Sequence, residues 1–175
     1  MKFNPLVSVI MNCYNSESYL DQAIKSVYNQ TYTNWEIIFW DNASNDKTPQ
    51  IAKKHNKKLK YFKSENKTNL GDARINAVNV SKGDYLAFLD GDDLWMPCKL
   101  EKQLKAFLKN SEAGIVYSRA KLINEHNKIL GLMPYNQELP SGNIFRELVK
   151  ENFIPFVSAM VSREKYYESG GFPSN

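Results

Sequence analysis

The stretch DYLAFLDGDDLWMP, residues 84–97, joins a short apolar run to three aspartates within four positions. The run over 84–90 is too short for a typical helix and predicts a buried strand. Like charges this close together repel, and carboxylates beside a buried strand are costly to desolvate unless a cation neutralises them. The stretch therefore predicts an internal strand that ends in an acidic loop.

Short apolar runs alternate with amphipathic segments along most of the chain. Buried strands are predicted over 6–11, 35–41 and 84–90, and an edge strand over 58–63. Later strands are predicted over 113–124 and 153–162, with a turn and a short return strand over 124–131. Helices are predicted over 16–30 with Ser16 as N-cap, and over 48–56, 71–81, 98–109, 142–151 and 163–172. This alternation predicts the α/β class, with a mostly parallel central sheet and flanking helices.

The composition fits a single domain over 1–175. Hydrophobic residues make up 42% and charged residues 24% of the chain, which is ordinary for a globular protein. The net charge of +4, from 23 basic and 19 acidic residues, suits an anionic small molecule or a negatively charged membrane surface. Without a recognisable reading motif, this charge does not predict binding to nucleic acid.

Several features favour the cytoplasm. Cys13 and Cys98 do not make a disulfide framework, and the N-terminus carries no long apolar signal region. His55 and His126 have no metal-ligand spacing and are predicted on the surface. The lysine-rich helix over 98–109 could touch the inner face of an anionic membrane, and simple solvation explains its lysines equally well.

Polar residues follow three predicted strands where each strand ends. These are NCYN at 12–15, DNAS at 41–44 and DGDD at 90–93. In an open parallel sheet, ligands bind at the carboxyl ends of the strands. The three segments are therefore predicted to line one crevice.

The DGDD segment has bland interpretations as well as a functional one. Asp-Gly is a favoured turn pair, and an aspartate can cap a helix. Pro97 prefers the first helical position, which would put the cap at Met96 and leave the aspartates upstream. Carboxylate oxygens with open positions suit Mg²⁺ or Mn²⁺ bridging to phosphates, and we expect this role.

The chain resembles the inverting glycosyltransferases of family 2, which have the Rossmann-like GT-A fold. The resemblance lies in VSVIMNCYN, SVYNQTYTNWEIIFWDNASNDKT, GDYLAFLDGDDLWMPCKL and the final GGF. It implies an enzyme that transfers a sugar, most commonly from a UDP-sugar, to an acceptor hydroxyl. It also implies a glycan or lipid-linked acceptor, as in the synthesis of surface polysaccharides.

The resemblance assigns roles in donor binding. Asp90 is expected near the donor ribose and the metal, and Asp92 as a direct metal ligand; the role of Asp93 is left open. Asp41 is expected to hydrogen-bond the nucleobase, or else to cap its loop. Tyr14 is expected to stack on the base, or else to pack in the core, and Cys13 and Asn15 flank it in the same loop.

Two positions depart from the family pattern. Arg74 resembles the arginine of an Ala-Arg-Asn motif near the donor phosphates, but an isoleucine separates it from Asn76, so a structural ion pair is an equal alternative. Asn12 stands where the family usually has proline. Trp95 is expected to shape the sugar pocket or to pack under the loop.

The general base is the missing part. Relatives carry it some residues beyond GGF, so the base is expected beyond Asn175, and Glu164 and Glu168 are expected only to solvate their helix. We therefore expect the donor-binding part of a longer enzyme, truncated at its C-terminal end. The alternatives are a non-catalytic module that binds nucleotide sugars, or a nucleotidyltransferase. The latter normally has a glycine-rich basic loop, which NCYNSES lacks.

Overall fold

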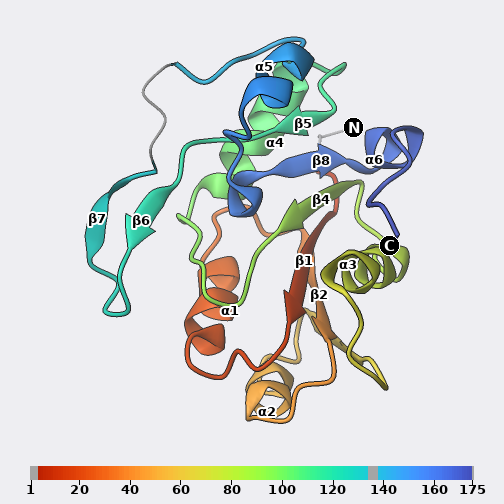
Figure 1. The fold of residues 1–175 in the computed structure, drawn as a ribbon, viewed down its shortest axis with the longest axis vertical. Coiled ribbons are helices and arrows are strands. Elements are labelled where there is room, and N and C mark those ends of the chain that lie inside the picture. The colour runs from red at the N-terminus through yellow and green to blue at the C-terminus, as the bar shows by residue number, and fades with distance from the viewer. Residues whose placement is uncertain (1–3, 134–137, 175) are drawn as a thin grey trace.

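The computed structural model describes residues 4–133 and 138–174. A six-stranded sheet forms the centre, in the order β3-β2-β1-β4-β8-β5 (Figure 1). Its strands are β1 (Val7–Cys13), β2 (Trp35–Asp41), β3 (Leu59–Lys63), β4 (Tyr85–Phe88), β5 (Ile115–Val116) and β8 (Met160–Ser162). The strands β1 to β4 are parallel, and β8 runs antiparallel to both β4 and β5. The predicted class, a mostly parallel sheet with flanking helices, is confirmed.

The remaining elements surround this sheet. The helices are α1 (Leu20–Tyr28), α2 (Thr48–Lys53), α3 (Leu70–Asn79), α4 (Lys99–Lys109), α5 (Phe145–Lys150) and α6 (Arg163–Glu168), with a 3₁₀ turn η1 (Phe156–Ser158). A separate hairpin is formed by β6 (Lys121–Ile123) and β7 (Ile129–Leu132). None of the helices in residues 4–133 and 138–174 has the length and apolar character that crossing a membrane would require.

The core has two parts because side chains alternate between the two faces of each strand. Val9 and Met11 of β1 pack with the apolar stripes of α1 and α4 on one face. Ile10 of β1 and Ile38 of β2 pack on the other face, with the apolar side of α3. Helices therefore cover both faces, as the short apolar runs of the sequence predict.

Several predicted boundaries are wrong. The first helix begins at Leu20 with Tyr19 at its N-cap position, so the cap predicted at Ser16 is wrong. The backbone N–H of Ser16 donates to the hydroxyl of Thr48 at 2.7 Å. The predicted strand over 113–124 is divided between β5 and β6. The strand predicted over 153–162 is the turn η1 followed by the short β8.

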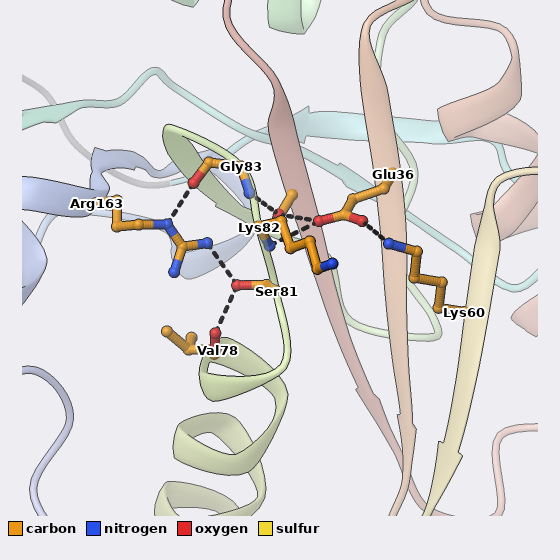
Figure 2. A network of polar contacts seen from close by, with 8 residues as sticks. Glu36, Lys60, Val78, Ser81, Lys82, Gly83 and Arg163 are labelled. Carbon is orange, nitrogen blue, oxygen red and sulfur yellow. Dashed lines mark hydrogen bonds and ion pairs between the residues drawn. The ribbon is translucent and has the colours of Figure 1, made fainter.

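The amino-terminal edge of the parallel strands holds a closed polar network (Figure 2). The Glu36 carboxylate accepts hydrogen bonds from the Ser8 hydroxyl at 2.7 Å, the Lys60 ammonium at 2.5 Å and the Lys82 backbone N–H at 2.8 Å. The Ser8 hydroxyl in turn accepts the N–H of Gly83 at 2.8 Å. This network joins the first residues of β1, β2 and β3 to the segment that enters β4.

Arg163 holds the same segment from the other side. Its guanidinium donates to the carbonyl of Gly83 and to the hydroxyl of Ser81, as Figure 2 shows. A Cβ on Gly83 would lie 2.4 Å from the backbone nitrogen of Ser8, so only glycine fits here. The start of β4 is fixed, and with it the strand that carries the aspartate loop.

Candidate functional site

The aspartate loop lies directly against the loop that follows β1. A Cβ on Gly91 would lie 3.0 Å from the sulfur of Cys13 and 3.1 Å from the Cβ of Ser16. Glycine at this position therefore lets the aspartate loop lie directly against the side chains of Cys13 and Ser16. The structure thus brings NCYN and DGDD together at the carboxyl-terminal edge of the parallel strands, as the sequence predicts.

The loop that follows β2 joins the same group. The N–H of Asn42 donates to the carbonyl of Cys13 at 2.9 Å, and the N–H of Asn15 donates to the Ser44 hydroxyl at 3.0 Å. The side chain of Asn15 accepts the N–H of Asn45 at 3.0 Å. Asn15 has a positive φ of 51°, which asparagine tolerates better than most residues. Asn15 is therefore a residue that positions the first two loops against each other.

The aspartates of the third loop lack strong cationic partners. Asp90 has one arginine nearby, the Nη2 of Arg74 at 3.9 Å from its Oδ1. Burial raises the pKa of Asp90, Arg74 lowers it in part, and the charge of Asp92 raises it further. Burial, with the charges of Asp92 and Asp90, raises the pKa of Asp93 to about 6. The loop concentrates negative charge that its surroundings do not neutralise.

The bland interpretations of DGDD can be compared with this geometry. The N–H of Asp93 donates to the carbonyl of Asp90 at 3.3 Å, so the segment is indeed a tight turn. Helix α4 begins only at Lys99, its N-cap position is Cys98, and no side chain caps it. Capping does not explain the aspartates, and the cap predicted at Met96 is wrong. A turn explains the path of the backbone, but it does not explain why three of its residues carry carboxylates.

Arg74 projects from α3 to the edge of this site. Its guanidinium carbon lies 3.8 Å from the ring centroid of Phe156 and 5.8 Å from that of Phe172, the phenylalanine of GGF. Burial lowers the pKa of Arg74, and the nearby Asp90 carboxylate raises it in part. The sequence leaves two roles open for Arg74, a structural ion pair and a contact with a donor phosphate. The long contact with Asp90 is an ion pair of the first kind. The contact with a donor phosphate stays a prediction.

The two residues expected at a nucleobase differ in exposure. Tyr14 is 42% exposed, so the alternative of a core tyrosine does not hold. Asp41 is 0% exposed, and its carboxylate accepts the Ser44 N–H at 2.8 Å and the Tyr61 hydroxyl at 2.5 Å. These bonds are those of a loop-capping aspartate. The contact of Asp41 with a base stays a prediction.

Cys13 and Asn12 have structural contacts. Cys13 is 3% exposed, and burial with the neighbouring aspartates raises the pKa of its thiol to about 12, although a hydrogen bond with Ser16 opposes the rise. The amide of Asn12 donates to the carbonyl of Ala73 at 2.8 Å and ties β1 to α3. Asn12 thus makes a side-chain bond that proline, the usual family residue, could not make.

The fit of a divalent ion rests on the donor chemistry. No group of three His, Cys, Asp or Glu side chains within residues 4–133 and 138–174 could hold a metal ion alone. Asp90 and Asp92 offer carboxylate oxygens, and Asp92 is exposed at the tip of the turn. Mg²⁺ and Mn²⁺ accept such oxygens and take their remaining ligands from water and phosphate. The residues therefore fit an ion that a diphosphate completes.

Other candidate residues lie away from this edge or serve packing. Trp95 is 6% exposed and donates its indole N–H to the carbonyl of Val157 at 3.0 Å, so it packs under the loop. Glu164 lines an opening with Asp84 and Ser162 beside the start of β4, away from Asp90. Glu168 pairs with Lys165 at 2.8 Å. The absence of a base role for these two glutamates stays a prediction.

The histidines and the lysine-rich helix differ in part from expectation. His55 is not a surface residue, because its side chain is 16% exposed and lies 2.9 Å from Asp21, whereas His126 is exposed at 81%. Lys99, at the start of α4, lies 4.2 Å from the ring centroid of Trp95, and burial lowers its pKa to about 7. Solvation alone does not account for this lysine.

One residue at this edge was missed by sequence reasoning. The ammonium of Lys67 lies 3.7 Å from the ring centroid of Tyr14. No role is assigned to Lys67 from the sequence, because its distance from Tyr14 along the chain hides the contact. The order of the parallel strands was the available signal, since Lys67 follows the end of β3.

Comparisons with known proteins agree with this architecture. The family model described as "Glycosyl transferase family 2" matches residues 8–170. UDP-Glc:alpha-D-GlcNAc-diphosphoundecaprenol beta-1,3-glucosyltransferase WfgD of Escherichia coli is 32% identical over 172 residues, which are 93% of this chain and 67% of that protein. Putative glycosyltransferase EpsE of Bacillus subtilis is 41% identical over 135 residues, covering 75% of this chain and 48% of its own length. An uncharacterized glycosyltransferase of Methanocaldococcus jannaschii is 40% identical over 131 residues, 72% of this chain and 45% of that protein.

Solved structures share the fold. S. aureus TarS 1–349 in complex with UDP-GlcNAc has a TM-score of 0.74 at 20% identity, over 95% of this chain and 48% of that one. Mannosyltransferase PcManGT from Pyrobaculum calidifontis, in complex with GDP-Man and Mn²⁺, has a TM-score of 0.72 at 21% identity, over 98% and 48%. The chain spans about half to two thirds of the length of these curated relatives, and about half of these solved chains.

Proposed function

The chain belongs to glycosyl transferase family 2, and we propose that its carboxyl-terminal edge binds a nucleoside diphosphate sugar for transfer to an acceptor hydroxyl with inversion. The observation that carries this proposal is the close approach of Gly91 to Cys13 and Ser16. It brings an exposed aromatic ring and a cluster of carboxylates to one edge of the sheet. A base with a π face and a diphosphate with its counter-ion require those two kinds of group.

Each group has a part in donor binding. Tyr14 offers an aromatic ring for the base to stack on, and Asp41 holds the loop beside it. Arg74 is held by Phe156 and is directed toward the carboxylates, where a diphosphate would offer it a second anionic partner. Asp90 and Asp92 would hold a divalent ion, which when bound supplies Lewis-acid stabilisation of charge on the departing diphosphate.

The donor and acceptor classes come from relatives. UDP-GlcNAc and GDP-Man are bound in TarS and PcManGT, respectively. The name of WfgD specifies UDP-Glc and a diphosphoundecaprenol acceptor, and TuaG of Bacillus subtilis is named for teichuronic acid biosynthesis. We propose a UDP-sugar donor and a glycan or lipid-linked acceptor, used at the cytoplasmic face of a membrane in surface polysaccharide synthesis.

A second candidate is a module that binds the nucleotide sugar without transferring it. It is favoured by the positions of two glutamates: Glu164 lines an opening beside the start of β4, and Glu168 is paired with Lys165. A general base must come within hydrogen-bond reach of the acceptor hydroxyl. Transfer of labelled sugar to an acceptor separates the candidates, since the module would bind the donor and leave it intact.

The donor site is tested by calorimetric titration of UDP and GDP with Mn²⁺ or with chelator. Wild-type protein is expected to bind at least one of the two more tightly with Mn²⁺. Asp92→Asn should remove this dependence, because it removes the charge of a ligand carboxylate. Glu112→Gln removes an exposed charge elsewhere and should keep the wild-type behaviour. Equal affinity of the wild type with Mn²⁺ and with chelator would contradict the metal role.

A further inference from the structure

Lys67 covers one aromatic face of Tyr14, the residue proposed to stack on the nucleobase. Its ammonium lies 3.7 Å from the Tyr14 ring centroid, well inside the range of a cation–π contact. A base stacked on the same face of Tyr14 would occupy the same space. Lys67 must therefore leave that face before a base can stack there.

The backbone that carries Lys67 is fixed beside the base-binding loop. The N–H of Ser64 donates to the carbonyl of Asp41 at 2.9 Å. Thr68 donates its N–H to the Asn42 side chain at 3.0 Å, and the amide of Asn42 returns a bond to the Thr68 carbonyl at 2.8 Å. A displaced Lys67 ammonium consequently stays at this edge, moving only on its own flexible stem.

Among residues 4–133 and 138–174, Lys67 has no competing partner of opposite charge. Within the described part of the chain, none of the ion pairs includes Lys67, whereas Lys25, Lys60, Lys105 and Lys165 each pair with a carboxylate. The side chain is exposed, so its ammonium is free to move. The contact with Tyr14 is weak enough at an exposed site for a ligand to replace it.

We propose that Lys67 is a donor-binding residue that exchanges partners: it rests on Tyr14 in the free protein and pairs with the phosphates once a base displaces it. The proposal rests on the proposed function, because it requires a nucleotide at this edge. The contact with the Tyr14 ring and the contact with the phosphates both use the positive charge of the Lys67 ammonium. The exchange favours ligands that carry both a base and phosphates over ligands that carry a base alone.

The test compares UDP with uridine, and GDP with guanosine, on wild-type protein and Lys67→Met. Methionine keeps an apolar stem and removes the charge. The dissociation constant for the diphosphate should rise about two- to fivefold, the range for an exposed ion pair. The constant for the nucleoside should stay the same or fall, because the competitor for the ring is gone. Lys57→Met is the matched control and should change neither, because Lys57 is an exposed lysine that precedes β3 at the opposite edge of the sheet.

Two further measurements separate the charge of Lys67 from stacking and from packing. Tyr14→Ala should weaken nucleoside and diphosphate alike, about fivefold or more, because base stacking is common to both. In 1 M salt, where screening acts over about 3 Å, the difference between wild type and Lys67→Met should shrink. A difference that persists unchanged in high salt would point to packing and overturn the proposal.

The outcomes for Lys67 and for the whole site can be told apart. A nucleoside-to-diphosphate ratio of dissociation constants that falls at least twofold in Lys67→Met supports the proposal. An unchanged ratio, with wild-type binding intact, overturns the role of Lys67 alone. Wild-type protein that binds neither UDP nor GDP overturns the proposed function, and the role of Lys67 with it.

Discussion

The two ends of the same parallel strands differ in how far their carboxylates are paired with partners in the chain. At the amino-terminal edge, the Glu36 carboxylate accepts three hydrogen bonds and is 8% exposed. At the carboxyl-terminal edge, the nearest cation to Asp90 is 3.9 Å away, and Asp93 has neighbours of its own sign. Charges that are matched within the chain serve stability. Charges left unmatched at a strand end indicate a partner from outside.

The amino-terminal edge also contains a polar group that is unpaired among residues 4–133 and 138–174, so the two edges differ only in how they treat charged groups. Trp35 begins β2, at the amino-terminal edge, and its buried indole N–H has no hydrogen-bond acceptor within the described residues. The aromatic group is neutral, so its unpaired donor costs far less than an unpaired carboxylate would. The contrast between the two edges therefore concerns ionic groups, and variants at each edge should have opposite effects.

The largest effect is expected from Gly83→Ala at the amino-terminal edge. The new Cβ would lie 2.4 Å from the Ser8 nitrogen and 2.8 Å from the Leu6 carbonyl oxygen, both backbone atoms. We expect the free energy of unfolding in urea to fall by about 3 kcal/mol. Gly114→Ala is the control, since its Cβ would meet nothing closer than 3.5 Å. Equal losses in the two variants would show that the close approach at Gly83 is not the cause.

A smaller loss of stability is expected from Glu36→Ala. It leaves the Ser8 hydroxyl and the Lys82 N–H without their acceptor, so unfolding should become easier by about 2 kcal/mol. Lys60 is 48% exposed and can return to solvent, which limits the loss. Glu36→Gln keeps an acceptor oxygen and should lose less. Identical losses would mean that the bonds are not responsible.

The same network gives a pH dependence with a definite sign. Burial alone would raise the Glu36 pKa, but its bonds with Lys60, Ser8 and Lys82 lower it below the ordinary 4.5. The stabilisation is therefore present above pH 4.5 and disappears as the pH falls through the folded-state value. Urea unfolding between pH 7 and pH 3 should show a steeper acid loss in wild type than in Glu36→Gln. Parallel curves would contradict this assignment.

The smallest effect, and one of opposite sign, is expected at the carboxyl-terminal edge. Asp93 has a pKa raised to about 6, so its charged form destabilises the fold as the pH rises through the range from 3.8 to 6. Asp93→Asn in chelator at pH 7 should therefore increase the free energy of unfolding by about 1 kcal/mol. The gain should vanish below pH 3.8. The exposed Glu112→Gln should show no gain, and a loss of stability in Asp93→Asn would contradict the contrast.

The sequence predicts the fold well where the signal is local. The apolar runs WEIIFWD and YLAF appear as β2 and β4, and the edge position of β3 follows from its alternating lysines. The meeting of the loop after β1 with the aspartate loop also follows, because parallel strands bring their ends to one edge. These features depend on periodicity and topology, which a sequence displays.

Other features depend on contacts between distant residues. Glu36 lies within an apolar strand, and the sequence around it does not indicate that Lys60 and Lys82 are its partners. The first helix has its N-cap position at Tyr19 rather than at Ser16, and the N–H of Ser16 instead donates to the distant Thr48 hydroxyl. Lys67 reads as one lysine among several. In each case the deciding partner is remote in the chain, so no local pattern records it.

The burial of Cys13 under Gly91 has a practical consequence for experiments. A thiol with a pKa of about 12 is almost wholly protonated at neutral pH and reacts slowly with alkylating reagents. Cys98 is the only other cysteine, and it is partly exposed. A maleimide dye should therefore attach at Cys98 alone, without any engineered mutation. The label would stand at the start of α4, a reporter for changes in the neighbouring aspartate loop.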